Sequence, residues 1–150
     1  MQIRTDLAME SRETVRGLAG VAAHSLRRGH VEEIHVRIET EEAARALADL
    51  HESVIPYVVL SLGAEGALLA CDAGVFHGKP PEITPRNTVG CGDSMTAGFA
   101  VGMARSLPAE DTFRMALAVS AASALSLFTG DFDPAEYERL LPEISIRRIL

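Results

Sequence analysis

The pattern of apolar and polar residues is weak at the amino-terminal end of the chain and clear in the remainder. One face of residues 7–26 is roughly apolar, which is compatible with a helix, although two glycines weaken that interpretation. Apolar and polar residues alternate over 34–38, which predicts a short half-buried strand. Thr40 is a typical N-cap residue, and the apolar stripe after it predicts a helix that ends near His51.

The middle of the chain has the pattern of consecutive short strands. The continuous apolar run 57–62 follows a proline and predicts a buried strand. A turn at 63–66 leads to a second predicted strand at 67–71, and a further turn leads to a third at 75–77. These residues therefore predict a β-meander.

Helical patterns dominate the last third of the chain. Residues 78–89 contain a glycine and three prolines, which favour an extended or looping segment. Two helices are expected at 92–105 and 110–128, and the second is apolar on most sides, which predicts deep burial. A short amphipathic helix at 134–141 and a strand-like segment at 144–150 follow.

Composition narrows the functional classes. The chain has 150 residues, about one domain, and is 47% hydrophobic and 23% charged. Its formal net charge is -7 and no block of five like charges occurs, so we expect no nucleic-acid or membrane partner. The longest uncharged run is too short for a membrane span, and early charged residues argue against a secretory signal. Two cysteines make no disulfide framework, so a cytoplasmic protein is expected.

A glycine-rich segment carries the candidate chemistry. Gly90 and Gly92 permit a tight turn and close backbone approach to a ligand, directly before a predicted helix. The free N–H groups and partial positive charge of a helix start form an anion site suited to phosphate. Asp93 stands beside that site, where its carboxylate could accept a proton from an attacking hydroxyl. The same spacing also fits an ordinary turn in which Asp93 is only a helix N-cap.

Several segments together resemble one enzyme family. Residues 87–99 resemble the carboxy-terminal signature of the ribokinase-like (PfkB-type) sugar kinases, whose core is Gly-Ala-Gly-Asp leading a helix. Residues 58–69 look like the strand and turn on the nucleotide side of that family. Residues 78–81 with 87–90 are similar to its phosphofructokinase and tagatose-6-phosphate kinase branch, and 116–124 resembles the alanine-rich helix beside the adenine pocket.

The resemblance implies a fold and an activity. Its members have an α/β fold of three layers, α/β/α, in which helices cover both faces of a mixed sheet. Residues 38–150 would be the carboxy-terminal, nucleotide-binding and catalytic half, with the β-meander and closing helices, whereas 1–37 match poorly. The implied reaction is ATP-dependent phosphorylation of a sugar or sugar phosphate, specifically a ketohexose phosphate such as tagatose 6-phosphate or a fructose phosphate. The implied cofactors are ATP and magnesium.

The resemblance also assigns roles to individual residues. It makes Asp93 the catalytic base, and the backbone amides of Gly90, Cys91 and Gly92 the donors that stabilise the transferred phosphoryl group. The residues implied for nucleotide binding are Ser61, Gly63, Ala64 and Gly66 along the phosphates, with Ser120 or Ser123 near the adenine. No protein metal ligand is assigned.

Two departures from the family pattern stand out. Cys91 replaces a small residue between the glycines, where a bystander thiol is favoured over a functional one, although thiols at helix starts can be reactive. The family's Asn-x-x-Glu element, which organises magnesium, is absent: Glu32 and Glu33 stand near the expected place, but the only Asn is Asn87.

The residues of the family's sugar-binding amino-terminal half also have no match. An alternative function is therefore a non-catalytic half-kinase that serves as a nucleotide-binding or assembly module. Either way, we expect a homo-oligomer or association with the missing amino-terminal half, because uncovered apolar surface favours association.

Overall fold

The computed structural model describes residues 40–52 and 57–150, and the elements expected at 7–26 and 34–38 lie outside these ranges. The described elements follow one another as α2 (Thr40–Glu52), β1 (Val58–Ser61), the single 3-10 turn η1 (Gly63–Glu65), β2 (Ala67–Cys71), β3 (Gly74–Lys79), α3 (Cys91–Ala104), α4 (Ala109–Leu125), α5 (Pro134–Leu140), η2 (Leu141–Glu143) and β4 (Ser145–Arg148).

The four strands form one sheet in the order β1-β2-β3-β4. The first three make the predicted β-meander, in which Leu68 of β2 lies opposite Leu60 of β1 and His77 of β3. The last strand, β4, pairs with the free edge of β3 and places Arg148 opposite Phe76. All three pairings are antiparallel, so the described part of the chain contains only an antiparallel part of the mixed sheet expected from the family.

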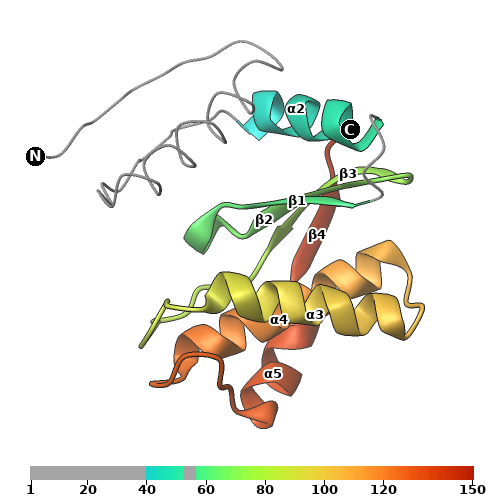
Figure 1. Cartoon of the computed structure of the whole chain (residues 1–150). Coiled ribbons are helices and arrows are strands. Elements are labelled where there is room, and N and C mark those ends of the chain that lie inside the picture. The colour runs from blue at the N-terminus through green and yellow to red at the C-terminus, as the bar shows by residue number, and fades with distance from the viewer. Residues whose placement is uncertain (1–39, 53–56) are drawn as a thin grey trace, which may run out of the picture.

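Helices cover both faces of this sheet, as the three-layer prediction requires. In Figure 1, α2 lies on one face, while α3, α4 and α5 lie on the other. Neighbouring residues of β2 point to opposite layers: Leu68 packs in the cluster with Ala44 and Leu47 of α2, and Leu69 packs in the cluster with Phe99 and Phe113. Because both faces are covered, β2 is buried at every position and reads as a continuous apolar run.

Helices α3 and α4 approach each other closely through small residues. A Cβ at Gly98 would lie 2.6 Å from the Cα of Ala116, and one at Gly102 would lie 2.7 Å from Thr112 Cγ2. The ten buried residues of α4 confirm the prediction of a deeply buried helix. This close packing fixes the start of α3, which carries the candidate site, relative to α4.

Two boundary and burial predictions were wrong. The run 57–62 was expected to be a buried strand, but β1 is shorter and half-buried, because it is the edge strand of the described sheet. Helix α4 ends at Leu125 rather than near residue 128, since Ser126 adopts an extended backbone (φ -77°, ψ 154°). The segment after α4 is thereby free to turn back towards the start of α3.

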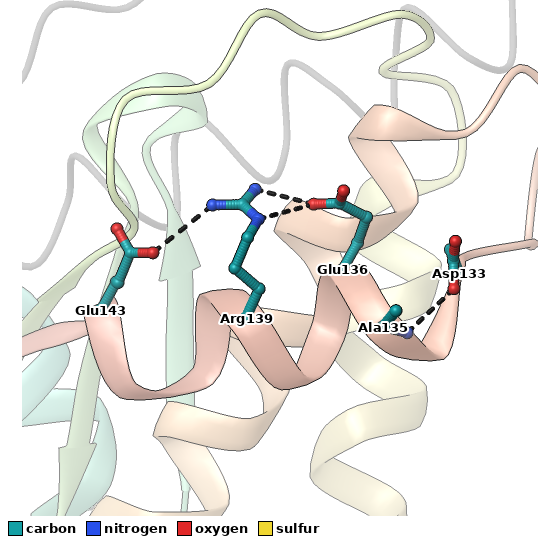
Figure 2. A network of polar contacts seen from close by, with 5 residues as sticks. All are labelled: Asp133, Ala135, Glu136, Arg139 and Glu143. Atoms are coloured by element: carbon teal, nitrogen blue, oxygen red, sulfur yellow. Dashed lines mark hydrogen bonds and ion pairs between the residues drawn. The ribbon is translucent and has the colours of Figure 1, made fainter.

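The closing helix α5 is held by polar contacts along its exposed side (Figure 2). Asp133 caps the helix by accepting a hydrogen bond of 2.9 Å from the Ala135 N–H. Arg139 donates to Glu136 at 2.7 Å and to Glu143 at 3.4 Å, and these carboxylates hold the pKa of Arg139 above its usual value. No helix within 40–52 or 57–150 has the length and apolar character that crossing a membrane requires.

Candidate active site

The glycine-rich loop places Asp93 inside helix α3 rather than at its cap. Gly90 is the N-cap residue, with φ 84° and ψ 0°, a left-handed conformation that favours glycine. The side chain of Thr129 is a second reason for glycine at position 90, because a Cβ at Gly90 would lie 2.6 Å from Thr129 Cγ2. Asp93 is exposed in the first turn of the helix. The alternative interpretation of Asp93 as the N-cap is therefore wrong, since Gly90 occupies that position.

Asn87 ties this loop to the segment that follows α4. Its Oδ1 accepts a hydrogen bond of 3.0 Å from the Val89 N–H, which fixes the turn before Gly90. Its Nδ2 donates to Leu127 O and to Thr129 Oγ1, both at 3.4 Å. The sequence analysis placed Asn87 in the family signature 87–99 and noted it as the single Asn of the chain, but it did not predict this bridging role.

Two hydroxyl contacts from α4 fix the first turn of α3. Ser120 donates to the carbonyl oxygen of Cys91 at 3.0 Å, and Ser94 donates to Ser123 at 3.0 Å. Ser94 and Ser123 are both buried, and Ser123 is only 2% exposed. The structure thus gives both α4 serines a partner on α3, and Ser123 lies away from any surface that a ligand could reach.

The second loop, around η1, is held against strand β3. Gly66 has φ 88°, and a Cβ there would collide with the carbonyl oxygen of Gly78. Three contacts of 2.8 Å hold the loop in place: Leu62 N–H to Gly66 O, His77 Nε2 with Glu65 O, and Lys79 Nζ to Glu65 Oε2. Glycine at position 66 is therefore required both for the turn and for the close approach to β3.

A cavity of about 490 Å³ lies between the two loops. Its walls come from the η1 loop, the extended segment after β3, the start of α3 and one side of α4. The predicted site residues that line it are Ser61, Gly63, Ala64, Gly66, Cys91, Gly92 and Ser120. Gly90 and Asp93 are adjacent in sequence to two of these residues but do not themselves line the cavity, and Ser123 is buried and does not line it either.

The cavity has an apolar wall and a polar rim. Ile83, Met95 and Leu117, with alanines of α4, supply apolar surface, and Glu65, Lys79 and Glu82 supply charge. An apolar pocket with a few convergent polar groups is typical of a small-molecule site. None of these three charged residues was among the predicted site residues. Glu65 and Lys79 lie in segments that resemble the family, 58–69 and 78–81, but the resemblance gave them no role.

Two titratable groups at the cavity are shifted in opposite directions. The Lys79 ammonium, by hydrogen bond and by charge, holds the pKa of Glu65 below its usual value. Burial raises the pKa of the Cys91 thiol, whose Sγ lies 3.8 Å from Asn87 O. The bystander interpretation of Cys91 is favoured, because a thiol that stays protonated is a poor nucleophile.

Metal binding by side chains alone has no support in the described ranges. Residues 40–52 and 57–150 bring no three His, Cys, Asp or Glu side chains together in a metal-binding arrangement. A second hollow of about 570 Å³, lined by Arg86, Phe128 and residues up to Glu136, contains none of the predicted site residues.

Known proteins with similar sequences include 1-phosphofructokinases. The chain is 35% identical over 111 residues to a 1-phosphofructokinase of Bacillus subtilis, covering 73% of this chain and 35% of the relative. It is 34% identical over 109 residues to a 1-phosphofructokinase of Escherichia coli K12, with the same coverage of both chains. The chain thus spans about a third of the length of these relatives.

Solved structures share the fold. A phosphofructokinase structure from Staphylococcus aureus superposes with a TM-score of 0.67 at 26% identity, covering 75% of this chain and 36% of that one. A ribokinase of Arabidopsis thaliana, solved with ribose and ATP, gives a TM-score of 0.59 at 25% identity over 69% of this chain and 34% of that one. The fold is accordingly a partial ribokinase-like α/β fold.

A family model for pfkB family carbohydrate kinases matches residues 29–135. That range includes both glycine loops and the helices that carry the cavity wall. The match covers more than half of the chain, and it agrees with the sequence relatives and with the superposed structures. This chain belongs to the pfkB family of carbohydrate kinases, in its phosphofructokinase-type branch.

Proposed function

We propose that residues 38–150 form the nucleotide-binding and catalytic part of an ATP-dependent kinase that phosphorylates a ketohexose phosphate. The observation that carries this proposal is the cavity between the two glycine loops, with Asp93 directly after its lining residue Gly92 at the start of α3. The volume of the cavity, about 490 Å³, lies within the range of small-molecule sites. Its apolar wall suits the adenine ring of a nucleotide.

The geometry supports separate roles for the two loops. The η1 loop would bind the nucleotide, and the start of α3 would receive the phosphate to be transferred, since free N–H groups at a helix start favour anions. Among the three proposed donors, the Cys91 N–H already makes a long bond of 3.4 Å to Thr88 O. A phosphate would therefore compete with a weak bond there.

In the proposed reaction, a sugar hydroxyl oxygen forms a bond to the γ-phosphorus while the bond from that phosphorus to the bridging oxygen breaks. The electron pair of the broken bond leaves with ADP, and the hydroxyl proton goes to the carboxylate of Asp93. The amides of Gly90, Cys91 and Gly92 stabilise the charge on the transferred group. Magnesium supplies charge neutralisation when bound; it commonly keeps water and phosphate ligands, so few protein ligands are needed.

The substrate class follows from the relatives. Both sequence relatives described above are 1-phosphofructokinases, which supports a fructose phosphate over ribose or a nucleoside. Tagatose 6-phosphate remains within the same proposal. The residues that contact the sugar are expected outside the matched third of the family's length.

We also propose that activity requires a partner that supplies the sugar side of the site, either a complementary amino-terminal half or another copy. The exposed apolar residues Val101 and Met103 of α3 support such an association. With its two cysteines free, we place this function in the cytoplasm.

A kinase assay on two preparations tests the proposal. The 150-residue protein alone should bind ATP weakly and leave all sugars unphosphorylated. The same protein co-expressed with the unmatched part of the Bacillus subtilis relative should release ADP with fructose 1-phosphate, fructose 6-phosphate or tagatose 6-phosphate faster than with ribose. A preference for ribose would overturn the substrate class, and sugar phosphorylation by a monomeric chain alone would overturn the need for a partner.

A further inference from the structure

Lys79 stands out among the residues of the cavity. Among the described residues, Lys79 is the single basic residue that lines the cavity. The carboxylates of Glu65 and Glu82 line it as well. It is also the only lysine in the chain, since the other thirteen of the fourteen basic residues are arginines. The charge of the rim without Lys79 would be negative.

The position of Lys79 is fixed from two directions. It is the last residue of β3, whose pairing with β4 places it opposite Ser145, and Ser145 Oγ donates to Lys79 O at 3.2 Å. At the other end of the side chain, Nζ donates to Glu65 Oε2 at 2.8 Å, and Glu65 in turn belongs to the η1 loop. The ammonium is therefore tied to the η1 loop beside the cavity, while its side chain stays partly exposed to water.

The contact with Glu65 leaves Lys79 able to bind a ligand as well. An ammonium has three N–H donors, and the bond to Glu65 uses one of them. The side chain of Lys79 is 42% exposed and that of Glu65 is 68% exposed. An ion pair this exposed is weak, so an incoming anion can share the ammonium or replace the carboxylate.

A basic side chain at this rim favours the binding of a polyphosphate, in addition to what magnesium and backbone amides supply. A nucleoside triphosphate is a polyanion, and like charges close together repel in a partly water-excluded cavity. Charge-assisted hydrogen bonds between an ammonium and a phosphate are stronger than neutral ones. Lys79 neutralises one carboxylate of the rim, and it can turn the same charge towards a ligand.

We infer that Lys79 is a binding residue of this cavity, that its ammonium contacts the phosphate groups of the nucleotide, and that the contact with Glu65 positions the ammonium for this. This inference rests on the proposed function and assigns it a residue outside both glycine loops. It predicts opposite effects for the two partners of the ion pair: loss of Lys79 weakens binding, whereas loss of the Glu65 charge does not.

Equilibrium binding of ATP to four variants of the full chain tests these opposite effects. Lys79→Met should raise the dissociation constant about tenfold or more, the effect of a lost charged hydrogen bond. Lys79→Arg should restore most of the affinity, and Glu65→Gln should bind at least as tightly as the unsubstituted protein. Arg139→Met removes an equally exposed positive charge from α5, outside the cavity lining, and should change nothing.

The inference is overturned if Lys79→Met binds ATP as well as Arg139→Met does. It is also overturned if Glu65→Gln weakens binding as much as Lys79→Met, because the ion pair would then only shape the loop. Either result, with ATP still bound by the unsubstituted protein, leaves the proposed function standing.

Chemical labelling separates failure of the inference from failure of the proposed function. The primary amines of the 150-residue chain are Lys79 and the amino-terminal amine, and after treatment with an amine-acetylating reagent peptide mass spectrometry reads the two separately. ATP and inorganic tripolyphosphate should each slow acetylation of Lys79 but not of the amino-terminal amine. Protection by tripolyphosphate without protection by ATP would uphold Lys79 as an anion-binding residue and overturn the nucleotide assignment. Protection by neither would overturn the inference.

Discussion

The two loops that border the cavity are held in place by different kinds of contact. The loop at Gly90–Gly92 is fixed from α4 by hydroxyl contacts, one of them the buried pair Ser94–Ser123. The η1 loop is fixed from β3 by the exposed ion pair Glu65–Lys79 and by the His77 ring. Buried hydrogen bonds are costly to leave unmade, whereas exposed ion pairs are weak and screened by salt. We therefore expect the loop proposed for catalysis to be the more rigid of the two, and the loop proposed for the nucleotide to be the more adjustable.

The largest expected effect is on catalysis at the more rigid loop. Asp93→Asn keeps the size of the side chain and removes its basic carboxylate, so turnover of the completed enzyme should fall by about 10²–10⁴-fold. The dissociation constant for ATP should change little, because the nucleotide is assigned to the other loop. A coupled assay of ADP release, with ATP binding as its control, measures both. Turnover near that of the unsubstituted enzyme would mean that Asp93 only favours the helix start.

Two glycine substitutions in the η1 loop separate the cost of a left-handed backbone from the cost of a steric clash. Gly66→Ala adds a Cβ that collides with Gly78 O at a left-handed φ of 88°, and it should cost about 3 kcal/mol or more of the free energy of unfolding. Gly63→Ala has a similar left-handed φ of 60° but meets nothing within 4 Å, so its cost should be only about 1–2 kcal/mol. Urea unfolding of both variants measures the difference. Equal costs would show that the close approach to β3 is not what requires glycine at position 66.

The buried hydroxyl pair can be broken from one side. Ser123→Ala leaves the Ser94 hydroxyl buried without its acceptor and should cost about 1–3 kcal/mol of the free energy of unfolding. The double variant Ser94→Ala, Ser123→Ala removes both polar groups and should be less destabilised than the sum of the two single variants. Strict additivity in urea unfolding would contradict the contact. Salt should leave the effect unchanged, unlike contacts of the η1 loop.

The smallest expected effect is the pH dependence of the ion pair. Lys79 lowers the pKa of Glu65 from its usual value of 4.5, so the folded state holds the proton less tightly than the unfolded state does. The stabilisation from this pair is therefore complete above pH 4.5 and is lost as the pH falls through the lowered pKa. An NMR titration of the Glu65 carboxyl should show its pKa rising in Lys79→Met. Identical titrations in the two proteins would exclude the pairing in solution.

The parts of the fold that were predictable are those with a local signal. The β-meander follows from short apolar runs separated by glycine turns, and the burial of α4 follows from its apolar character on most sides. The burial of β1 was misjudged because a continuous apolar run indicates two covered faces but not whether the strand is central or at an edge. Val59 packs towards α3 and α4, and Val58 towards α2, as two covered faces require.

The sequence indicated the segments of the candidate site one by one, but not the contacts between them. The glycine loop and Asp93 lie within one short segment, but Ser120 meets Cys91 across 29 residues and Lys79 meets Glu65 across 14. Such pairs depend on how helices and strands pack, which periodicity does not reveal. Ser123 illustrates the limit: a serine in an alanine-rich helix could bind a ligand or another helix, and only packing decides.

The pairing of β4 with β3 has a consequence for the chain while it is being synthesised on the ribosome. Lys79 and Ser145 are partners in the sheet although 66 residues separate them. At about 5–20 residues per second, translation needs roughly 3–13 s to add the residues between them. During that interval β3 has emerged with its outer edge unpaired, and an open edge is a template for pairing with another chain. Crowded polysomes, where neighbouring nascent chains expose the same edge together, are therefore where this protein is most vulnerable to mispairing.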